Sequence, residues 1–219
     1  MYFLVACEVS QRVCKAFRDK GHIAFSCDVI EQSGGHPEWH IMQDVLPLLN
    51  GFCSFTTGDG VTHELAQRWD MIIAFPPCTY LTTAGAVRLY PTKGVLDEER
   101  YKKGLEAAAF FRAIFNANCE RIVIENPTPL RVFDLPRYNQ VIQPYLFGHP
   151  YKKRTCLWLK GVEPTEIITE GVVSYINAGS KNNKGQPRSA QATASKIRDA
   201  KTRSKTFEGV AAAMAEQWG

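Results

Sequence analysis

Residues 71–78 read MIIAFPPC, and residues 121–127 read RIVIENP. Each stretch has a short apolar run rich in β-branched side chains, and a proline, which cannot continue a strand ladder, follows it closely. Strands that are apolar on both faces are typical of the interior of a parallel sheet. The two stretches therefore predict an α/β protein in which each strand ends beside a reactive side chain.

These reactive side chains are Cys78 and Glu125. In an open α/β sheet, ligands bind at the carboxyl ends of the strands. A thiol and a carboxylate that meet there can form a covalent adduct and handle the proton that it requires. Most free cysteines are buried as small apolar groups, but Cys78 follows two prolines and precedes a polar, glycine-containing segment, residues 79–86, that we expect to move. We interpret Cys78 as a nucleophile.

The order of strand, Pro-Pro-Cys, loop, long helix, strand and Glu-Asn-Pro resembles the cytosine-5 DNA methyltransferases, which use S-adenosylmethionine. The resemblance implies a doubly wound, mostly parallel, Rossmann-like sheet. It also implies methylation of cytosine carbon 5 in DNA, with Cys78 adding to the base and Glu125 assisting at ring N3. The substrate contacts implied by the motifs are Thr79, Tyr80, Asn126 and Lys152.

The N-terminal part has the order expected of a nucleotide-binding unit. Residues 2–10 (YFLVACEVS) read as a strand and a turn, and a second strand delivers Asp28, which lies about 20 residues beyond that turn, as in units whose acidic residue binds a ribose. The turn lacks the glycine pair that is usual in the family. The resemblance implies S-adenosylmethionine contacts at Ala6, Cys7, Glu8, Asp28, Asp44 and Pro76.

Two residues compete for the acidic contact to the adenine, Asp44 and Asp59. Residues 50–68 read as an insertion of turn residues and scattered polar ones, in which Asp59 is a turn residue. We therefore prefer Asp44.

Residues 147–159 resemble the family's basic motif, whose arginines hold the target base and the catalytic glutamate. The usual pattern is shifted here, so the arginine role falls to Arg154 or Lys153. Downstream, eight basic residues and one acidic residue lie between Lys181 and Lys205. In isolation such a tract is typical of a solvated loop, but beside a cytosine-chemistry site it favours binding to nucleic-acid phosphates. The candidates are Lys181, Lys184, Arg188, Arg198 and Arg203.

The pattern predicts strands near 2–6, 22–27, 71–75, 121–125 and 155–160, and helices near 10–20, 97–116 and 207–217. The long helix should begin at Asp97 as its N-cap and bury Leu105, Ala108, Ala109, Phe111 and Phe115. We divide the chain into a catalytic core (1–160), a reduced basic recognition segment (161–205) and a C-terminal helix that returns to the core (206–219).

Composition sets further limits. The 219 residues, 45% of them hydrophobic, suffice for one core. No apolar stretch is long enough for a membrane span and the start lacks a basic leader, so we expect a cytosolic protein, in the host cytoplasm if phage-encoded. The seven cysteines are odd in number and contain no CxxC pair, which argues against a disulfide framework, a zinc site and a zinc-dependent deaminase.

The short recognition segment leaves the target open. It suits relaxed sequence preference, a second copy or accessory partner that completes the recognition surface, or a single-stranded DNA, RNA or mononucleotide substrate. Such compactness is typical of a phage or mobile-element gene. A catalytically silent nucleic-acid-binding relative is the alternative from another functional class.

Overall fold

The computed structural model describes residues 1–149, 153–166 and 205–219. The main sheet has seven strands in the order β3-β2-β1-β6-β7-β9-β8. Its strands are β1 (Tyr2–Ala6), β2 (Ile23–Asp28), β3 (His40–Met42), β6 (Met71–Ala74), β7 (Ile122–Asn126), β8 (Gln140–Ile142) and β9 (Thr155–Lys160). The α-helices are α1 (Arg12–Asp19), α2 (Ala86–Leu89), α3 (Glu98–Phe115) and α6 (Glu208–Trp218). Five 3₁₀ turns among the described residues are η1 (Pro37–Trp39), η2 (Leu46–Leu48), η3 (Thr83–Gly85), η4 (Arg131–Phe133) and η5 (Pro144–Phe147).

The sheet is mostly parallel, as the sequence predicts. Strand β1 pairs in parallel with both β2 and β6, and the outer pairs β2–β3 and β6–β7 are parallel too. Only β9 runs against its neighbours β7 and β8. The chain continues to one side of β1 through β2 and returns on its other side through β6, which makes the gap between the β1 and β6 ends the topological switch point where ligands bind in such sheets.

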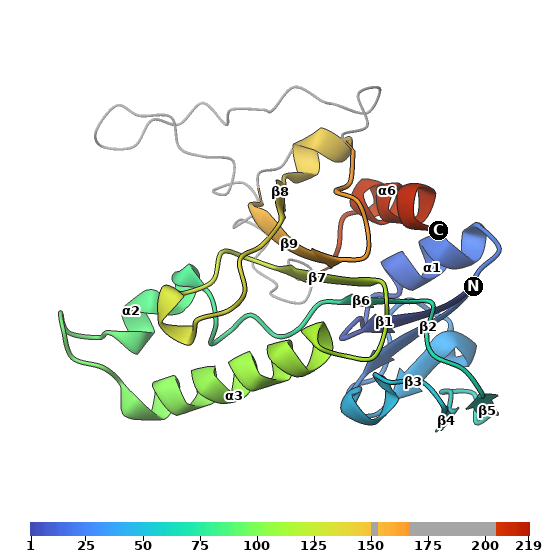
Figure 1. Cartoon of the computed structure of the whole chain (residues 1–219), viewed down its shortest axis with the longest axis horizontal. Helices are drawn as coiled ribbons and strands as arrows, with labels where there is room; N and C mark the ends of the chain where they lie inside the picture. The colour runs from blue at the N-terminus through green and yellow to red at the C-terminus, as the bar shows by residue number, and fades with distance from the viewer. Residues whose placement is uncertain (150–152, 167–204) are drawn as a thin grey trace.

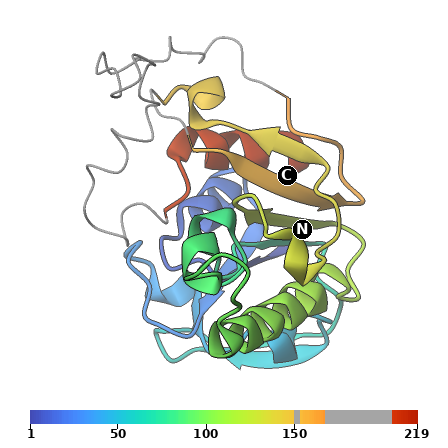
Figure 2. The ribbon, with the colours of Figure 1, turned by 90° about the vertical axis from the view of Figure 1, so that its left-hand side faces the viewer.

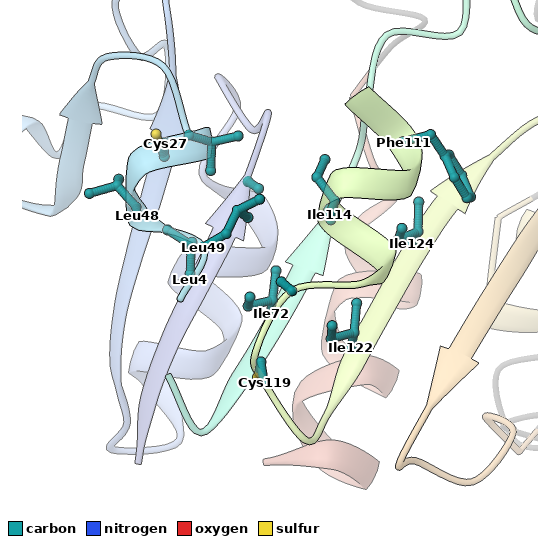
Figure 3. Close-up of a cluster of buried hydrophobic side chains, with 14 of the residues drawn as sticks. Leu4, Cys27, Leu48, Leu49, Ile72, Phe111, Ile114, Cys119, Ile122 and Ile124 are labelled. Atoms are coloured by element: carbon teal, nitrogen blue, oxygen red, sulfur yellow. The ribbon is translucent and has the colours of Figure 1, made fainter. Parts of the chain in front are cut away.

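Helices cover both faces of the sheet (Figures 1 and 2). Alternate strand residues point to opposite faces. On one face Ile72, Ile122 and Ile124 lie beside α3 and Leu4 lies beside Leu48 and Leu49 (Figure 3), whereas on the other face Val5, Ile73 and Val123 pack with residues of α1 and α6. This burial on both faces explains why the strand sequences are continuously apolar rather than alternating.

The long helix begins where the sequence predicts. The Asp97 side chain accepts a hydrogen bond from the backbone N–H of Arg100 at 2.8 Å, which satisfies one of the free donors of the first turn. Ala108 and Phe111 are buried, but the predicted burial of Leu105 and Ala109 is wrong, because both lie on the solvent side of α3. Phe115 is partly buried.

The interpretation of residues 50–68 as turn residues and scattered polar ones is also wrong. The segment forms an antiparallel hairpin of β4 (Cys53–Thr56) and β5 (Thr62–Leu65), and Phe55 and Leu65 bury their side chains against the core. Asp59 lies in the hairpin turn, as expected, where it accepts hydrogen bonds from the Thr57 hydroxyl and the Val61 N–H.

The other predicted elements agree with the structure to within two residues at each end. The C-terminal helix α6 packs beside α1 on one face of the sheet (Figure 1). The Arg12 guanidinium on α1 donates to the carbonyl oxygen of Thr206 at 2.7 Å, and Lys20 forms an ion pair with Glu216 at the far end of the same helix pair. Within the described ranges, no helix has the length and apolar character that a membrane crossing requires.

Candidate active site

A cavity of about 550 Å³ lies at the carboxyl ends of the parallel strands. The turn after β1, the end of β2, the loop after β6 and the end of β7 all contribute to it, because these four strand ends meet at one edge of the sheet. Its lining residues are Cys7, Glu8, Val9, Ser10, Asp28, Ser33, Phe75, Pro76, Pro77, Cys78, Thr79, Glu125, Asn126, Pro127, Lys153, Lys205 and Thr206. The sequence-predicted thiol and carboxylate therefore line a single cavity.

Cys78 is the exposed cysteine of the chain, whereas the other six are buried or partly buried. Although Cys78 is reached by solvent, the surrounding protein partly desolvates its thiol and so raises its pKa; the negative charge of Glu125 raises this pKa further, and the positive charge of Lys153 lowers it. Thus Glu125 and Lys153 both act on the sulfur, in opposite directions. With Glu125 ionised, the arrangement favours the neutral thiol.

Of the two basic candidates, Lys153 lines the cavity, and its backbone N–H donates to the Gln143 side chain at 3.0 Å. Arg154 is absent from the lining. Its guanidinium instead donates to the hydroxyls of Thr128 and Tyr138, both at 3.1 Å, in exposed hydrogen bonds. The structure therefore brings Lys153, and not Arg154, to Glu125 and Cys78.

The turn after β1 adopts a backbone that normally favours glycine. Cys7 has a φ of 59°, in the left-handed region, although it carries a side chain. Ala6 is fully buried in the strand and does not line the cavity. The turn therefore takes a glycine-like conformation at a residue that has a side chain.

Glu8 is a buried carboxyl group at the start of α1. Its two oxygens accept hydrogen bonds from the backbone N–H groups of Val13 at 2.7 Å and Cys14 at 3.1 Å. Burial raises the pKa of Glu8 to about 7, against the opposing effect of these hydrogen bonds. Glu8 therefore caps α1 while one side of it lines the cavity.

The two acidic cofactor candidates differ in position. Asp28 lies at the end of β2, lines the cavity and is half-buried, and burial raises the pKa of its carboxyl group. Asp44 does not line the cavity and is exposed, with its carboxylate accepting from the Leu46 N–H. The pKa of the Cys7 thiol is raised mainly by burial, and the negative charges of Asp28 and Asp44 raise it further. Asp44 therefore lies close enough to the β1 turn to act on it electrostatically.

The loop after Cys78 is structured in this chain. It contains η3 and α2, and two backbone hydrogen bonds tie it to residues 128–130: Thr83 N–H to Thr128 O, and Leu130 N–H to Leu81 O. Thr79 lines the cavity. Tyr80 does not, and its ring lies 4.9 Å from the Arg100 guanidinium carbon.

Several predicted contacts lie outside the described residues: Lys152, Lys181, Lys184, Arg188, Arg198 and Arg203. The sequence analysis did not single out Ser10, Ser33, Lys205 and Thr206 as ligand contacts, although all four line the cavity. Ser33 arrives there because its backbone N–H donates to Val9 O at 2.7 Å, a tertiary contact with no local signal. In the described parts of the chain, no group of three or more His, Cys, Asp or Glu side chains could hold a metal ion.

No protein-family model matches the chain, and no curated protein matches it. Among solved structures, one described as a candidate DNA modification methyltransferase encoded within an E. coli prophage aligns with a TM-score of 0.42 and 12% identity, over 73% of this chain and 46% of that one. An rRNA methylase from Escherichia coli aligns with a TM-score of 0.34 and 15% identity, over 72% and 55%. The chain spans about half the length of both, and likenesses this low assign neither a family nor an activity.

Proposed function

We propose that the protein methylates carbon 5 of cytosine in DNA, with S-adenosylmethionine as methyl donor and Cys78 as covalent nucleophile. The observation that carries the proposal is the shared cavity: Cys78 and Glu125 line it together with the β1 turn and Asp28. This chemistry needs a thiol and a proton donor that both contact the same cytosine, and a methyl donor bound beside them.

The residues present fit such a cofactor. A cavity of about 550 Å³ is within the usual range for small-molecule sites. Asp28 offers a half-buried carboxylate at the end of the second strand, where ribose hydroxyls are expected to donate, and the β1 turn lines the same cavity. When bound, S-adenosylmethionine supplies an electrophilic methyl group.

The chain's own residues would perform the remaining steps. The Cys78 thiol gives its proton to the Glu125 carboxylate and its sulfur forms a bond to carbon 6, while Glu125 passes that proton to N3 and the electron pair of the 5,6 double bond moves toward carbon 5. Carbon 5 then accepts the methyl group. Solvent water then accepts the carbon 5 proton, the electron pair of that C–H bond restores the double bond and expels the Cys78 thiolate, and the proton on N3 returns through Glu125 to the sulfur.

The electrostatics of Cys78 link these steps. Since the negative charge of Glu125 raises the pKa of Cys78, neutralisation of Glu125 by the proton that it shares with the base removes that effect. Lys153 continues to favour the thiolate. The nucleophile would therefore be activated when a base engages Glu125, which limits side reactions of a free thiolate.

The proposed substrate is a cytosine outside the base stack, because a base within a duplex cannot present carbon 6 to a thiol. Duplex DNA requires the base to be flipped out, whereas single-stranded DNA, RNA or dCMP does not. The basic tract expected to bind phosphates lies outside the described residues except for Lys205, so the experiment must decide among these substrates.

Labelled S-adenosylmethionine would be incubated with the protein and, in parallel, with duplex DNA, single-stranded DNA, RNA and dCMP. We expect label in duplex DNA and none with Cys78→Ser. Cys53→Ser is the matched control, since Cys53 is partly buried on β4 and does not line the cavity. Label only in another substrate would change the substrate class. Label with Cys78→Ser would refute the nucleophile, and no label together with no cofactor binding by calorimetry would refute the enzyme.

A further inference from the structure

Asn126 links the two strand ends that carry the proposed catalytic groups. It follows Glu125 directly at the end of β7, and its side-chain Nδ2 donates to the carbonyl oxygen of Pro76 at 2.8 Å. Pro76 lies two residues before Cys78. The hydrogen bond therefore connects the residue next to Glu125 with the segment that carries Cys78.

Asn126 makes this hydrogen bond although its burial carries a free-energy cost, which indicates a functional role for the contact. The residue is 2% exposed, and its Oδ1 is the one buried side-chain oxygen or nitrogen in the described residues without a hydrogen-bond partner. An unsatisfied buried acceptor destabilises a fold, and this cost is borne together with a hydrogen bond whose loss would leave the buried Pro76 carbonyl oxygen without its donor. Because Pro76 O can only accept, the amide orientation with Nδ2 toward it is fixed.

A second side chain holds the other side of Cys78. Arg100, on α3, donates from Nη2 to the carbonyl oxygen of Thr79 at 2.7 Å, and its guanidinium lies over the Tyr80 ring. A Cβ atom at Gly85 would lie 2.9 Å from the same Nη2, so the absence of a side chain there leaves room for the guanidinium. Arg100 thus contacts Thr79 and Tyr80, the two residues that follow the thiol.

We propose that Asn126 and Arg100 are positioning residues that hold residues 76–79 from both sides, so that the Cys78 sulfur stays facing Glu125. Neither side chain is required to touch the reacting atoms. The inference deepens the proposed function, on which its methyl-transfer readout rests, but the geometry it claims can be measured without any activity.

The test uses alkylation of Cys78 by iodoacetamide, followed by peptide mass spectrometry on the full-length protein. In the wild-type background, Glu125→Gln should accelerate alkylation at fixed pH, because it removes the charge that disfavours the thiolate. In an Asn126→Leu or Arg100→Met background, the sulfur is no longer held near residue 125, and the fold-change caused by Glu125→Gln should fall to about one. Methyl transfer should lose kcat while KM for the cofactor is unchanged.

Matched controls are Asn118→Leu and Lys102→Met, which alter exposed side chains away from the 76–79 segment. They should keep the wild-type effect of Glu125→Gln. Should the leucine variant fail to fold, Asn126→Ser, whose hydroxyl is too short to reach Pro76 O, repeats the measurement.

The inference is overturned if Glu125→Gln accelerates alkylation equally in the wild type and in both variants. If only one of the two variants loses the acceleration by Glu125→Gln, the claim that the segment is held from both sides is wrong. A wild-type protein without methyl transfer would refute the proposed function, yet the alkylation cycle would still decide whether Asn126 and Arg100 position the thiol.

Discussion

At the scale of single residues, the charges around one sulfur atom carry the chemistry. Burial and Glu125 raise the pKa of Cys78, and Lys153 lowers it. Cys78 and Glu125 could be placed at the cavity from the sequence, because Cys78 follows the apolar run of β6 after two prolines and Glu125 lies near the end of β7. The choice between Lys153 and Arg154 could not, since it depends on which of two adjacent side chains on the way into β9 turns toward the cavity.

Replacing Lys153 by methionine should raise the pKa of Cys78, and replacing Glu125 by glutamine should lower it, because each change removes one of the two charges that act on the thiol. The measurement is the pH dependence of the Cys78 alkylation rate, whose midpoint should move to higher pH for Lys153→Met and to lower pH for Glu125→Gln. Lys103→Met, which removes an exposed lysine paired with Glu99, is the control. Unchanged midpoints in both variants would contradict the charge assignment.

Gly104, inside α3, occupies a position where the neighbouring ring of Phe133 leaves no room for a side chain. A Cβ atom there would lie 2.1 Å from the ring of Phe133, which is 2% exposed and cannot move freely. Alanine at an exposed helix position would gain about 1 kcal/mol over glycine, but overpacking costs ~1–3 kcal/mol. We expect Gly104→Ala to lower the free energy of unfolding in urea, and Phe133→Leu in the same chain to restore part of it. A more stable Gly104→Ala protein would show that the ring yields.

At the scale of secondary-structure elements, the sequence predicts best where one signal dominates. The runs that became β6 and β7 are apolar on both faces, and Asp97 is a good N-cap, so these elements could be predicted. Strands β3 and β8 have three residues each, too few for a periodic pattern. The hairpin of β4 and β5 was missed because its polar residues face solvent and its buried residues are few.

Helix α1 is capped by Glu8 rather than by a residue at its N-cap position, and the raised pKa of this carboxyl group has a consequence for stability. Its pKa is about 7 in the folded protein, compared with an ordinary value of 4.5. The folded state therefore binds the proton more tightly, so this contribution is fully present below pH 4.5 and is lost as pH rises through about 7. It amounts to up to ~3 kcal/mol.

Glu8→Gln should abolish this contribution. Relative to the variant, the free energy of unfolding of the wild-type protein should decrease between about pH 4.5 and pH 7. Urea titrations of both proteins across this range measure the difference, which cancels groups common to both, such as His149, whose lowered pKa has the opposite effect on stability as pH falls. Parallel curves would mean that the Glu8 carboxyl titrates alike in the folded and unfolded chains.

At the scale of the whole molecule, the cavity combines segments that are far apart in the sequence. The strand-end rule predicts that Cys7, Asp28, Cys78 and Glu125 come together, and they do. It does not predict Arg100, which reaches Thr79 from a helix 21 residues later through a purely tertiary contact. Local motifs therefore identified the groups proposed to react, but not the side chains that hold them in place.

Lys205 and Thr206 line the cavity directly before α6, and Arg12 holds this segment through the carbonyl oxygen of Thr206. Arg12→Ala should weaken binding of S-adenosylhomocysteine about fivefold, as expected for the loss of one hydrogen bond of ~1 kcal/mol. Calorimetry measures the change. Lys20→Ala, which removes an ion pair between the same two helices at their far end, should leave the affinity unchanged. Equal losses in the two variants would point to general loosening of α6.

Because residues 205 and 206 contribute to the cavity, the protein could be divided into two polypeptides that must associate to form it. A break between residues 166 and 205 would leave the sheet with Cys78 and Glu125 on one fragment, and α6 with the final lining residues on the other. Neither fragment alone would contain the whole cavity. Ligand capture would then report on reassembly of the fragments, as in a complementation assay.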